Sequence, residues 1–118
     1  MQKRVLVVDD SNLMRHRIVQ CLTEAGHTVV GKARDGTEAV ELYQQLKPDV
    51  VTMDITMRGK DGISAAKEIL LLNPEAAIIF YTLIDTAAMV GQIRKITSAK
   101  LVKKGDEAAL LDTLTMLA

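Results

Sequence analysis

Apolar and polar residues follow two distinct periods along the chain. Short runs rich in β-branched residues, typical of buried strands, occur at 5–8, 28–30, 50–53, 77–81 and, more weakly, 101–102. Between these runs, apolar residues recur every three or four positions, which predicts helices over 13–25, 39–46, 63–70, 88–96 and 106–117. The pattern therefore predicts a strand followed by a helix, repeated five times.

Turn and cap residues agree with these boundaries. Gly26 is placed to close the first helix, Asp35 and Gly36 to form a turn before the second, and Asp106 to cap the last. Strands that are apolar throughout and alternate with helices predict a parallel sheet covered on both faces. The predicted fold class is α/β, a flavodoxin-like doubly wound sheet of strand order 2-1-3-4-5.

Composition narrows the class of protein. A length of 118 residues fits one domain spanning 1–118, and the 15 basic and 15 acidic residues cancel, which disfavours binding to nucleic acid or to anionic membranes. Neither a secretory segment nor a membrane span is indicated, so we expect a cytoplasmic protein. Cys21 is alone and fits plain packing, while His16 and His27 lack ligand spacing and are expected at the surface.

Polar residues gather where the predicted strands end. Strand one runs into Asp9 and Asp10, strand three into Asp54, strand four into Thr82, and strand five into a pair of lysines at 103–104. Parallel strands end at the same edge of a sheet, and the winding direction reverses between strands one and three. A ligand crevice is therefore predicted at this edge.

Three carboxylates in one crevice repel one another and need a proton or a cation between them. Oxygen ligands without histidine or thiol favour Mg²⁺, with Mn²⁺ as the alternative. Asp54, at the end of a central strand, can attack phosphorus directly, which leaves Asp9 and Asp10 to hold metal. A lysine from strand five then supplies a second cation, and the Thr82 hydroxyl donates to a phosphoryl oxygen.

At this point the chain resembles the receiver domain of two-component response regulators over essentially its whole length. The resemblance rests on VLVVDDS with Asp9 and Asp10, on PDVVTMDITM with Asp54, on the Asp-Gly pair at 61–62, and on Thr82. The segments VVDDSNLMR and VVTMDITM are most similar to stand-alone receivers of the chemotaxis type.

The resemblance implies a phosphorylation switch that takes a phosphoryl group from a histidine kinase onto Asp54. It implies that Asp10, Asp54 and the backbone carbonyl of Thr56 coordinate Mg²⁺, with Asp9 reaching the ion through water. Thr82 and the lysine then act on the phosphoryl group and alter the face formed by the fourth helix, fifth strand and fifth helix, which binds a downstream protein. Such a protein is a monomer or weak dimer that assists only its own phosphorylation and dephosphorylation.

The last strand departs from the family pattern. The family usually has Lys-Pro with a cis peptide there, whereas TSAKLVKKGDE places Lys104 at the proline position, so a trans bond is expected. Matching LVK to the family selects Lys103 as the active lysine, and counting from Thr82 selects Lys104; the sequence favours Lys103. No aromatic residue follows in this region, so Tyr81 is either a buried strand residue or a moving ring in its place.

Two rival functions arise from these features. The altered last strand is compatible with a pseudo-receiver, an interaction module with impaired switching, although the retained acidic residues argue against it. An aspartate-nucleophile phosphatase needs Asp-x-Asp on one strand end, and a flavodoxin-like electron carrier needs a neutral phosphate-binding loop where DDSNLM is acidic. Both enzymes are therefore disfavoured.

Overall fold

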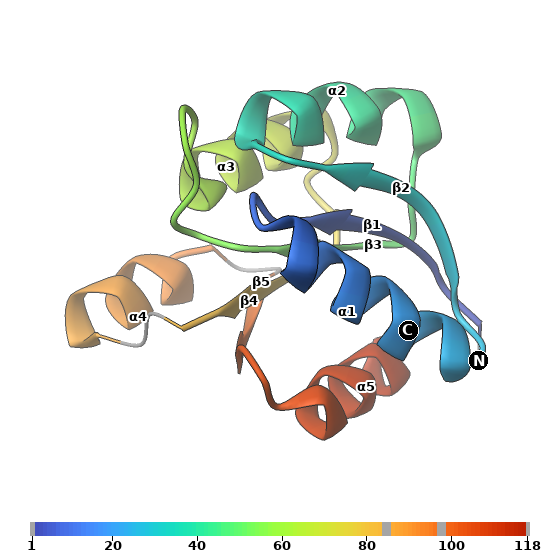
Figure 1. The fold of residues 1–118 in the computed structure, drawn as a ribbon. Coiled ribbons are helices and arrows are strands. Elements are labelled where there is room, and N and C mark those ends of the chain that lie inside the picture. The colour runs from blue at the N-terminus through green and yellow to red at the C-terminus, as the bar shows by residue number, and fades with distance from the viewer. Residues whose placement is uncertain (1, 84–85, 97–98, 118) are drawn as a thin grey trace.

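The fold is a parallel sheet between two layers of helices. The computed structural model describes residues 2–83, 86–96 and 99–117. In this part of the chain five strands form one sheet in the order β2-β1-β3-β4-β5, which confirms the predicted order (Figure 1). The strands are β1 (Arg4–Val8), β2 (Thr28–Ala33), β3 (Val50–Met53), β4 (Ile78–Thr82) and β5 (Ala99–Lys103).

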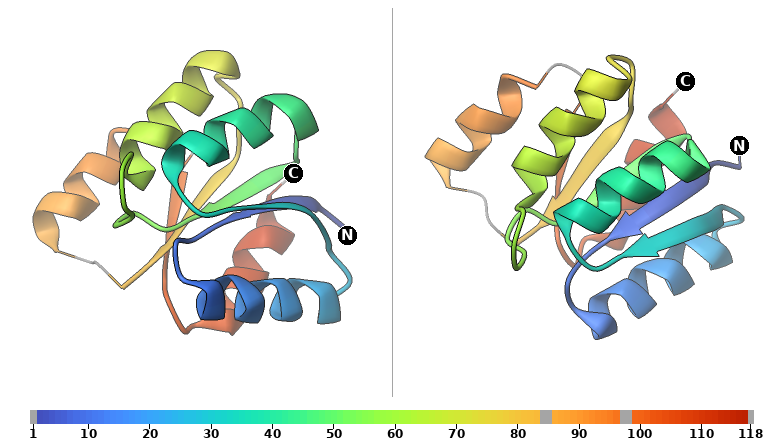
Figure 2. Two further views of the ribbon diagram at one scale, coloured as in Figure 1. Left: turned by 45° about the horizontal axis from the view of Figure 1, so that its top comes forward. Right: turned by 90° about the horizontal axis from the view of Figure 1, so that it is seen from above.

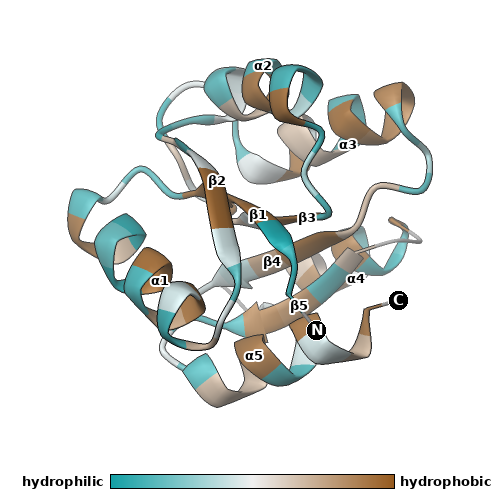
Figure 3. Ribbon diagram, turned by 90° about the vertical axis from the view of Figure 1, so that its right-hand side faces the viewer, coloured by the Kyte–Doolittle hydropathy of each residue, from teal (hydrophilic) through white to brown (hydrophobic). Residues whose placement is uncertain are grey.

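A helix follows each strand. The helices are α1 (Asn12–Glu24), α2 (Gly36–Leu46), α3 (Gly62–Leu72), α4 (Ala87–Arg94) and α5 (Glu107–Met116). Helices α1 and α5 cover one face of the sheet, and α2, α3 and α4 cover the other (Figure 2). Bands of polar and apolar residues alternate along α1 and α2, as expected for helices with one apolar side (Figure 3).

Strand β1 shows how one sequence supplies both cores. Val5 and Val7 pack in the cluster under α1 and α5, whereas Leu6 and Val8 pack in the cluster under α2 and α3. All four side chains are buried because successive residues of a strand point to opposite faces of a sheet that is covered on both sides. The continuous apolar run therefore reflects two covered faces.

Each helix begins after a polar residue whose side chain accepts a hydrogen bond from the amide three positions further along. Such a cap typically stabilises a helix by about 1 kcal/mol. The caps are Ser11, Asp35, Asp61, Thr86 and Asp106. The prediction for Asp106 is thus confirmed, and Gly26, with a φ of 91°, follows the end of α1 as predicted.

The two histidines differ in their surroundings. His16 is exposed, as predicted, but His27 is buried, and its Nδ1 accepts a hydrogen bond from the Lys3 amide at 3.0 Å. Burial, together with the nearby amino terminus and Lys3, lowers the pKa of His27 below its ordinary value. The prediction that His27 lies at the surface was wrong. The sequence around His27 does not show that Lys3, just before β1, packs against it. Among the described helices, none has the length and apolar character needed to cross a bilayer.

Candidate functional site

Three carboxylates meet at the carboxyl ends of β1 and β3. The strands pair in register at Val8 and Met53, so that Asp9 and Asp54 leave adjacent strands at the same level. One ligand oxygen from each of Asp9, Asp10 and Asp54 lies within 4.8 Å of the others. Asp9 and Asp54 are buried and Asp10 is exposed, which leaves the group open to solvent on one side. The arrangement could hold a metal ion.

Hydrogen bonds hold both the backbone and the side chain of Asp9. Its amide donates to the Ala33 carbonyl at 3.1 Å, and its Oδ1 accepts from the Ser11 amide at 2.9 Å. The Arg15 guanidinium donates to its backbone carbonyl. These bonds fix the direction of the carboxylate as the chain turns from β1 into α1.

Asp54 is fixed by the neighbouring strand and by the start of its own loop. Its amide donates to the Val8 carbonyl at 3.0 Å, and its Oδ1 accepts from the Ile55 amide at 2.8 Å. Its Oδ2 lies 3.1 Å from the Lys104 ammonium. One oxygen is thus held by backbone and the other faces a cation.

Lys104 joins two of the carboxylates. Its Nζ lies 2.8 Å from Asp9 Oδ2 and 3.1 Å from Asp54 Oδ2, and only 11% of its side chain is exposed. Lys103, in contrast, is exposed as the last residue of β5. The structure therefore reverses the order of preference from the sequence, which placed Lys103 before Lys104.

The reason lies in where β5 ends. Alternation along the strand sends Leu101 and Lys103 toward the α4 side, whereas Val102 packs under α5. Lys104 already belongs to the turn, and its amide donates to the Thr82 carbonyl at 2.9 Å. From this position the Lys104 side chain reaches across the carboxyl ends of the strands to Asp9 and Asp54. The described residues contain no cis peptide bond, so the Lys103–Lys104 bond is trans as predicted.

Charge and burial act against each other at this site. Burial raises the pKa of the Asp54 carboxyl above its ordinary value, and Asp9 adds to this, which together outweigh the lowering by Lys104. Burial alone would lower the pKa of Lys104, but its close ion pair with Asp9 and the charge of Asp54 raise it. The ammonium is therefore charged at neutral pH, while the carboxylates gain from any further cation.

The two threonines expected at the site, Thr56 and Thr82, differ in exposure. Thr82 is buried at the end of β4, beside β3, and its carbonyl receives the Lys104 amide. Thr56 is exposed, two residues after Asp54. Both thus lie on the edge of the sheet that carries the carboxylates.

Two arginines stand at the open side of the site. A hollow of about 470 Å³ beside Asp10 is lined by Asp10, Ser11, Arg34, Asp35 and Arg58. Arg58 lies in the loop between β3 and α3, and Arg34 was not predicted from the sequence as part of the site. The rule that parallel strands end at one edge could have found Arg34, because it directly follows β2.

Gly62 lets the loop after Asp54 fold back closely on the strand. Its amide donates to the Ile55 carbonyl at 2.9 Å, and a Cβ at this position would lie 2.0 Å from the Asp54 carbonyl oxygen. The obstructing atom is backbone and cannot rotate away. The Asp-Gly pair thus supplies a helix cap and then the space for this approach.

Gly62→Ala is expected to lower the free energy of unfolding by about 3 kcal/mol, because the methyl group overpacks against the Asp54 backbone. Gly91→Ala is the matched control, since Gly91 lies in α4 with nothing within 4 Å of an added Cβ. That control should gain about 0.5–1 kcal/mol from helix propensity. Urea unfolding measures both changes, and a Gly62→Ala protein as stable as the wild type would contradict the close approach.

Comparison with known proteins places the chain in a family. The sequence model described as the response regulator receiver domain matches residues 5–115. The chain is 51% identical over 90 residues to the chemotaxis protein CheY of Thermotoga maritima, covering 76% of this chain and 75% of that protein. It is 40% identical over 113 residues to the protein CcdB of Bacillus subtilis, covering 95% and 94%.

A solved structure agrees with the sequence matches. A chain of the CheX-CheY-BeF3-Mg complex from Borrelia burgdorferi superimposes with a TM-score of 0.89 and 30% identity, covering 95% of this chain and 86% of that one. The chain belongs to the response regulator receiver domains, and its relatives include stand-alone chemotaxis proteins.

Proposed function

We propose that the protein is a phosphorylation switch in which Asp54 accepts a phosphoryl group in a Mg²⁺-dependent reaction. The observation that carries the proposal is the geometry of Asp54, a buried carboxylate beside two other carboxylates with Lys104 at 3.1 Å. The family membership of the chain and the chemotaxis relatives support the same conclusion.

The residues present fit a divalent metal. The donor set of Asp9, Asp10 and Asp54 consists of oxygen alone, which suits Mg²⁺, with Mn²⁺ as the alternative. By the family resemblance the backbone carbonyl of Thr56 completes the protein ligands. A bound ion supplies positive charge for the oxygens of the phosphoryl group during transfer. The named complex from Borrelia burgdorferi, with its BeF3 and Mg, supports this choice.

The chemistry assigned to the chain is one substitution at phosphorus. A carboxylate oxygen of Asp54 forms the new O–P bond, the P–N bond of a phosphohistidine breaks, and the histidine nitrogen keeps the electron pair. Lys104 balances the charge of the phosphoryl oxygens, and the Thr82 hydroxyl donates to one of them. Hydrolysis of the aspartyl phosphate by water then releases inorganic phosphate and resets the switch.

The partners in this proposal are two proteins. A histidine kinase supplies the phosphoryl group, and a downstream protein binds the face formed by α4, β5 and α5. The names of the chemotaxis relatives support an output in chemotaxis. We infer a cytoplasmic monomer or weak dimer, as expected from the sequence.

The test uses a small acyl phosphate as phosphodonor. With Mg²⁺ present, intact-protein mass spectrometry is expected to show the addition of one phosphoryl group. Chelation of the metal should slow this addition by about a hundredfold or more, because the carboxylates then lack their second cation. An unmodified protein after long incubation with Mg²⁺ would contradict the switch and favour the rival interaction module.

A further inference from the structure

The hydroxyl of Tyr81 has a partner that connects it to the site. Tyr81 is 2% exposed and lies on the opposite face of β4 from Thr82, in the core cluster under α1 and α5. Its hydroxyl accepts a hydrogen bond from the Gly105 amide at 2.9 Å. Gly105 is the residue directly after Lys104. The ring is thus a buried strand residue, and its one polar atom holds the turn that carries the lysine.

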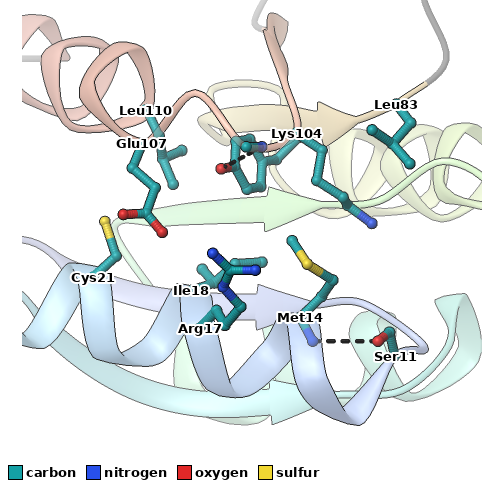
Figure 4. Close-up of a pocket in the computed structure, with 11 residues that line it drawn as sticks. Ser11, Met14, Arg17, Ile18, Cys21, Leu83, Lys104, Glu107 and Leu110 are labelled. Atoms are coloured by element: carbon teal, nitrogen blue, oxygen red, sulfur yellow. Dashed lines mark hydrogen bonds between the residues drawn. The ribbon is translucent and has the colours of Figure 1, made fainter.

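This hydrogen bond lies beside a groove between α1 and α5. The groove has a volume of about 390 Å³, and its walls include Met14 and Cys21 of α1, Tyr81 of β4, and Lys104 and Leu110 from the C-terminal part. Lys104 lies at one end of the groove near Leu83, and Cys21 and Leu110 lie at the other (Figure 4). The turn therefore borders space that packed side chains do not fill.

A backbone hydrogen bond closes the turn on itself, from the Asp106 amide to the Lys103 carbonyl at 3.0 Å. Gly105 has a φ of 100°, a conformation that glycine adopts freely, and no proline follows the lysine to stiffen the backbone. Strand β4 holds the turn at two points, the Thr82 carbonyl on the Lys104 amide and the Tyr81 hydroxyl on the Gly105 amide. The peptide that joins Lys104 to Gly105 lies in the middle of the turn, and its amide makes the second of these bonds. Loss of that bond therefore frees this peptide to rotate while the turn stays closed by the Asp106 amide.

We propose that Tyr81 is a positioning residue for Lys104: its hydroxyl, by accepting the Gly105 amide, keeps the lysine ammonium between Asp9 and Asp54. The proposal rests on the proposed function in so far as Lys104 serves phosphoryl transfer. The alternative role for Tyr81 is core packing alone. The two roles separate because phenylalanine keeps the ring and removes only the hydroxyl.

The matched control is the other tyrosine of the chain. Tyr43 is also buried, and its hydroxyl accepts from the Asn73 side chain at 3.0 Å, in the part of the fold where α2 and α3 meet. Tyr43→Phe therefore removes an equivalent hydrogen bond away from the site. A change that appears in both Tyr81→Phe and Tyr43→Phe therefore reflects a loss of folding stability and not a change in the position of Lys104.

The first measurement is independent of phosphorylation. The Lys104 side-chain ammonium and the Gly105 amide are observed by NMR in the metal-free protein at one pH. In Tyr81→Phe, Gly105 amide exchange should accelerate by about tenfold and the Lys104 ammonium signal should shift or broaden. Tyr43→Phe should leave both unchanged. Unchanged Gly105 and Lys104 signals in Tyr81→Phe would overturn the proposal.

The second measurement follows phosphorylation by the acyl phosphate with Mg²⁺. Tyr81→Phe should react about tenfold more slowly than the wild type, and Tyr43→Phe at the wild-type rate. In a Lys104→Met background the same Tyr81 change should alter the rate by less than about twofold, since its effect passes through the lysine. Equal slowing in both backgrounds would overturn the proposal. If the wild type took up no phosphoryl group, the proposed function would fail, and the NMR comparison would still decide the role of Tyr81.

Discussion

Asp54→Asn is expected to abolish the phosphoryl adduct. The carboxylate is the nucleophile in the proposed reaction, and an amide in its place is far less nucleophilic and carries no charge for the metal. The neighbouring carboxylates offer no substitute in the proposed reaction, because Asp9 and Asp10 are the residues assigned to hold the metal. The adduct should therefore fall below detection in the presence of Mg²⁺ and the acyl phosphate.

Asp61→Asn is the matched control for this change. Asp61 lies in the same loop, and it caps α3 through its Oδ1, a role that asparagine fills equally well. The control removes the same charge and should retain the adduct in intact-protein mass spectrometry. An adduct of equal yield on the Asp54→Asn protein would place the acceptor elsewhere and contradict the assignment.

Lys104→Met is expected to slow phosphorylation by about a hundredfold, the cost typical of removing one preorganised donor to developing charge. Lys103→Met is expected to change the rate by no more than about twofold, because Lys103 is exposed and an exposed side chain contributes little. The two lysines are adjacent and undergo the same substitution, so that composition and net charge are matched. Only the contact with Asp9 and Asp54 differs.

Rates of adduct formation from the acyl phosphate with Mg²⁺ measure this difference. A thermal unfolding scan of each variant confirms that both are folded at the assay temperature. A slow Lys103→Met protein beside a normal Lys104→Met protein would contradict the geometry and restore the preference that the sequence pattern favoured.

The carboxylates illustrate what strand-end reasoning can predict. Asp54 is far along the chain from the adjacent pair Asp9 and Asp10, yet the placement of all three on one edge followed from the parallel order alone. The structure brings their oxygens within 4.8 Å. Every parallel strand presents its carboxyl end to the same edge, so the residue that ends each strand is placed there by local sequence alone.

The lysine illustrates where such reasoning stops. Lys103 and Lys104 differ by one position, and one position in a strand reverses the direction of a side chain. The choice depends on the residue at which β5 ends and on the bond from the Lys104 amide to Thr82, a residue of another strand. Neither is encoded in the residues next to the lysines.

Tyr81 and His27 extend the same lesson to polar atoms in the core. The pattern of β4 is sufficient to bury Tyr81, but the partner of its hydroxyl is the amide of Gly105, 24 residues further along. His27 has a similar dependence on Lys3. A buried polar atom takes its partner from whatever packs against it, and sequence spacing does not report that neighbour.

The alternation of strands and helices, the parallel sheet and the edge at which the acidic residues gather could all be predicted from the residues alone. These follow from periodicity and from the fixed direction of parallel strands, which act within each segment. The tertiary structure was needed to show which lysine faces Asp54, which hydroxyl the Gly105 amide meets, and how closely Gly62 approaches the Asp54 backbone. Each of these contacts joins residues that are distant in the sequence, so it forms only when the strands, helices and loops pack together.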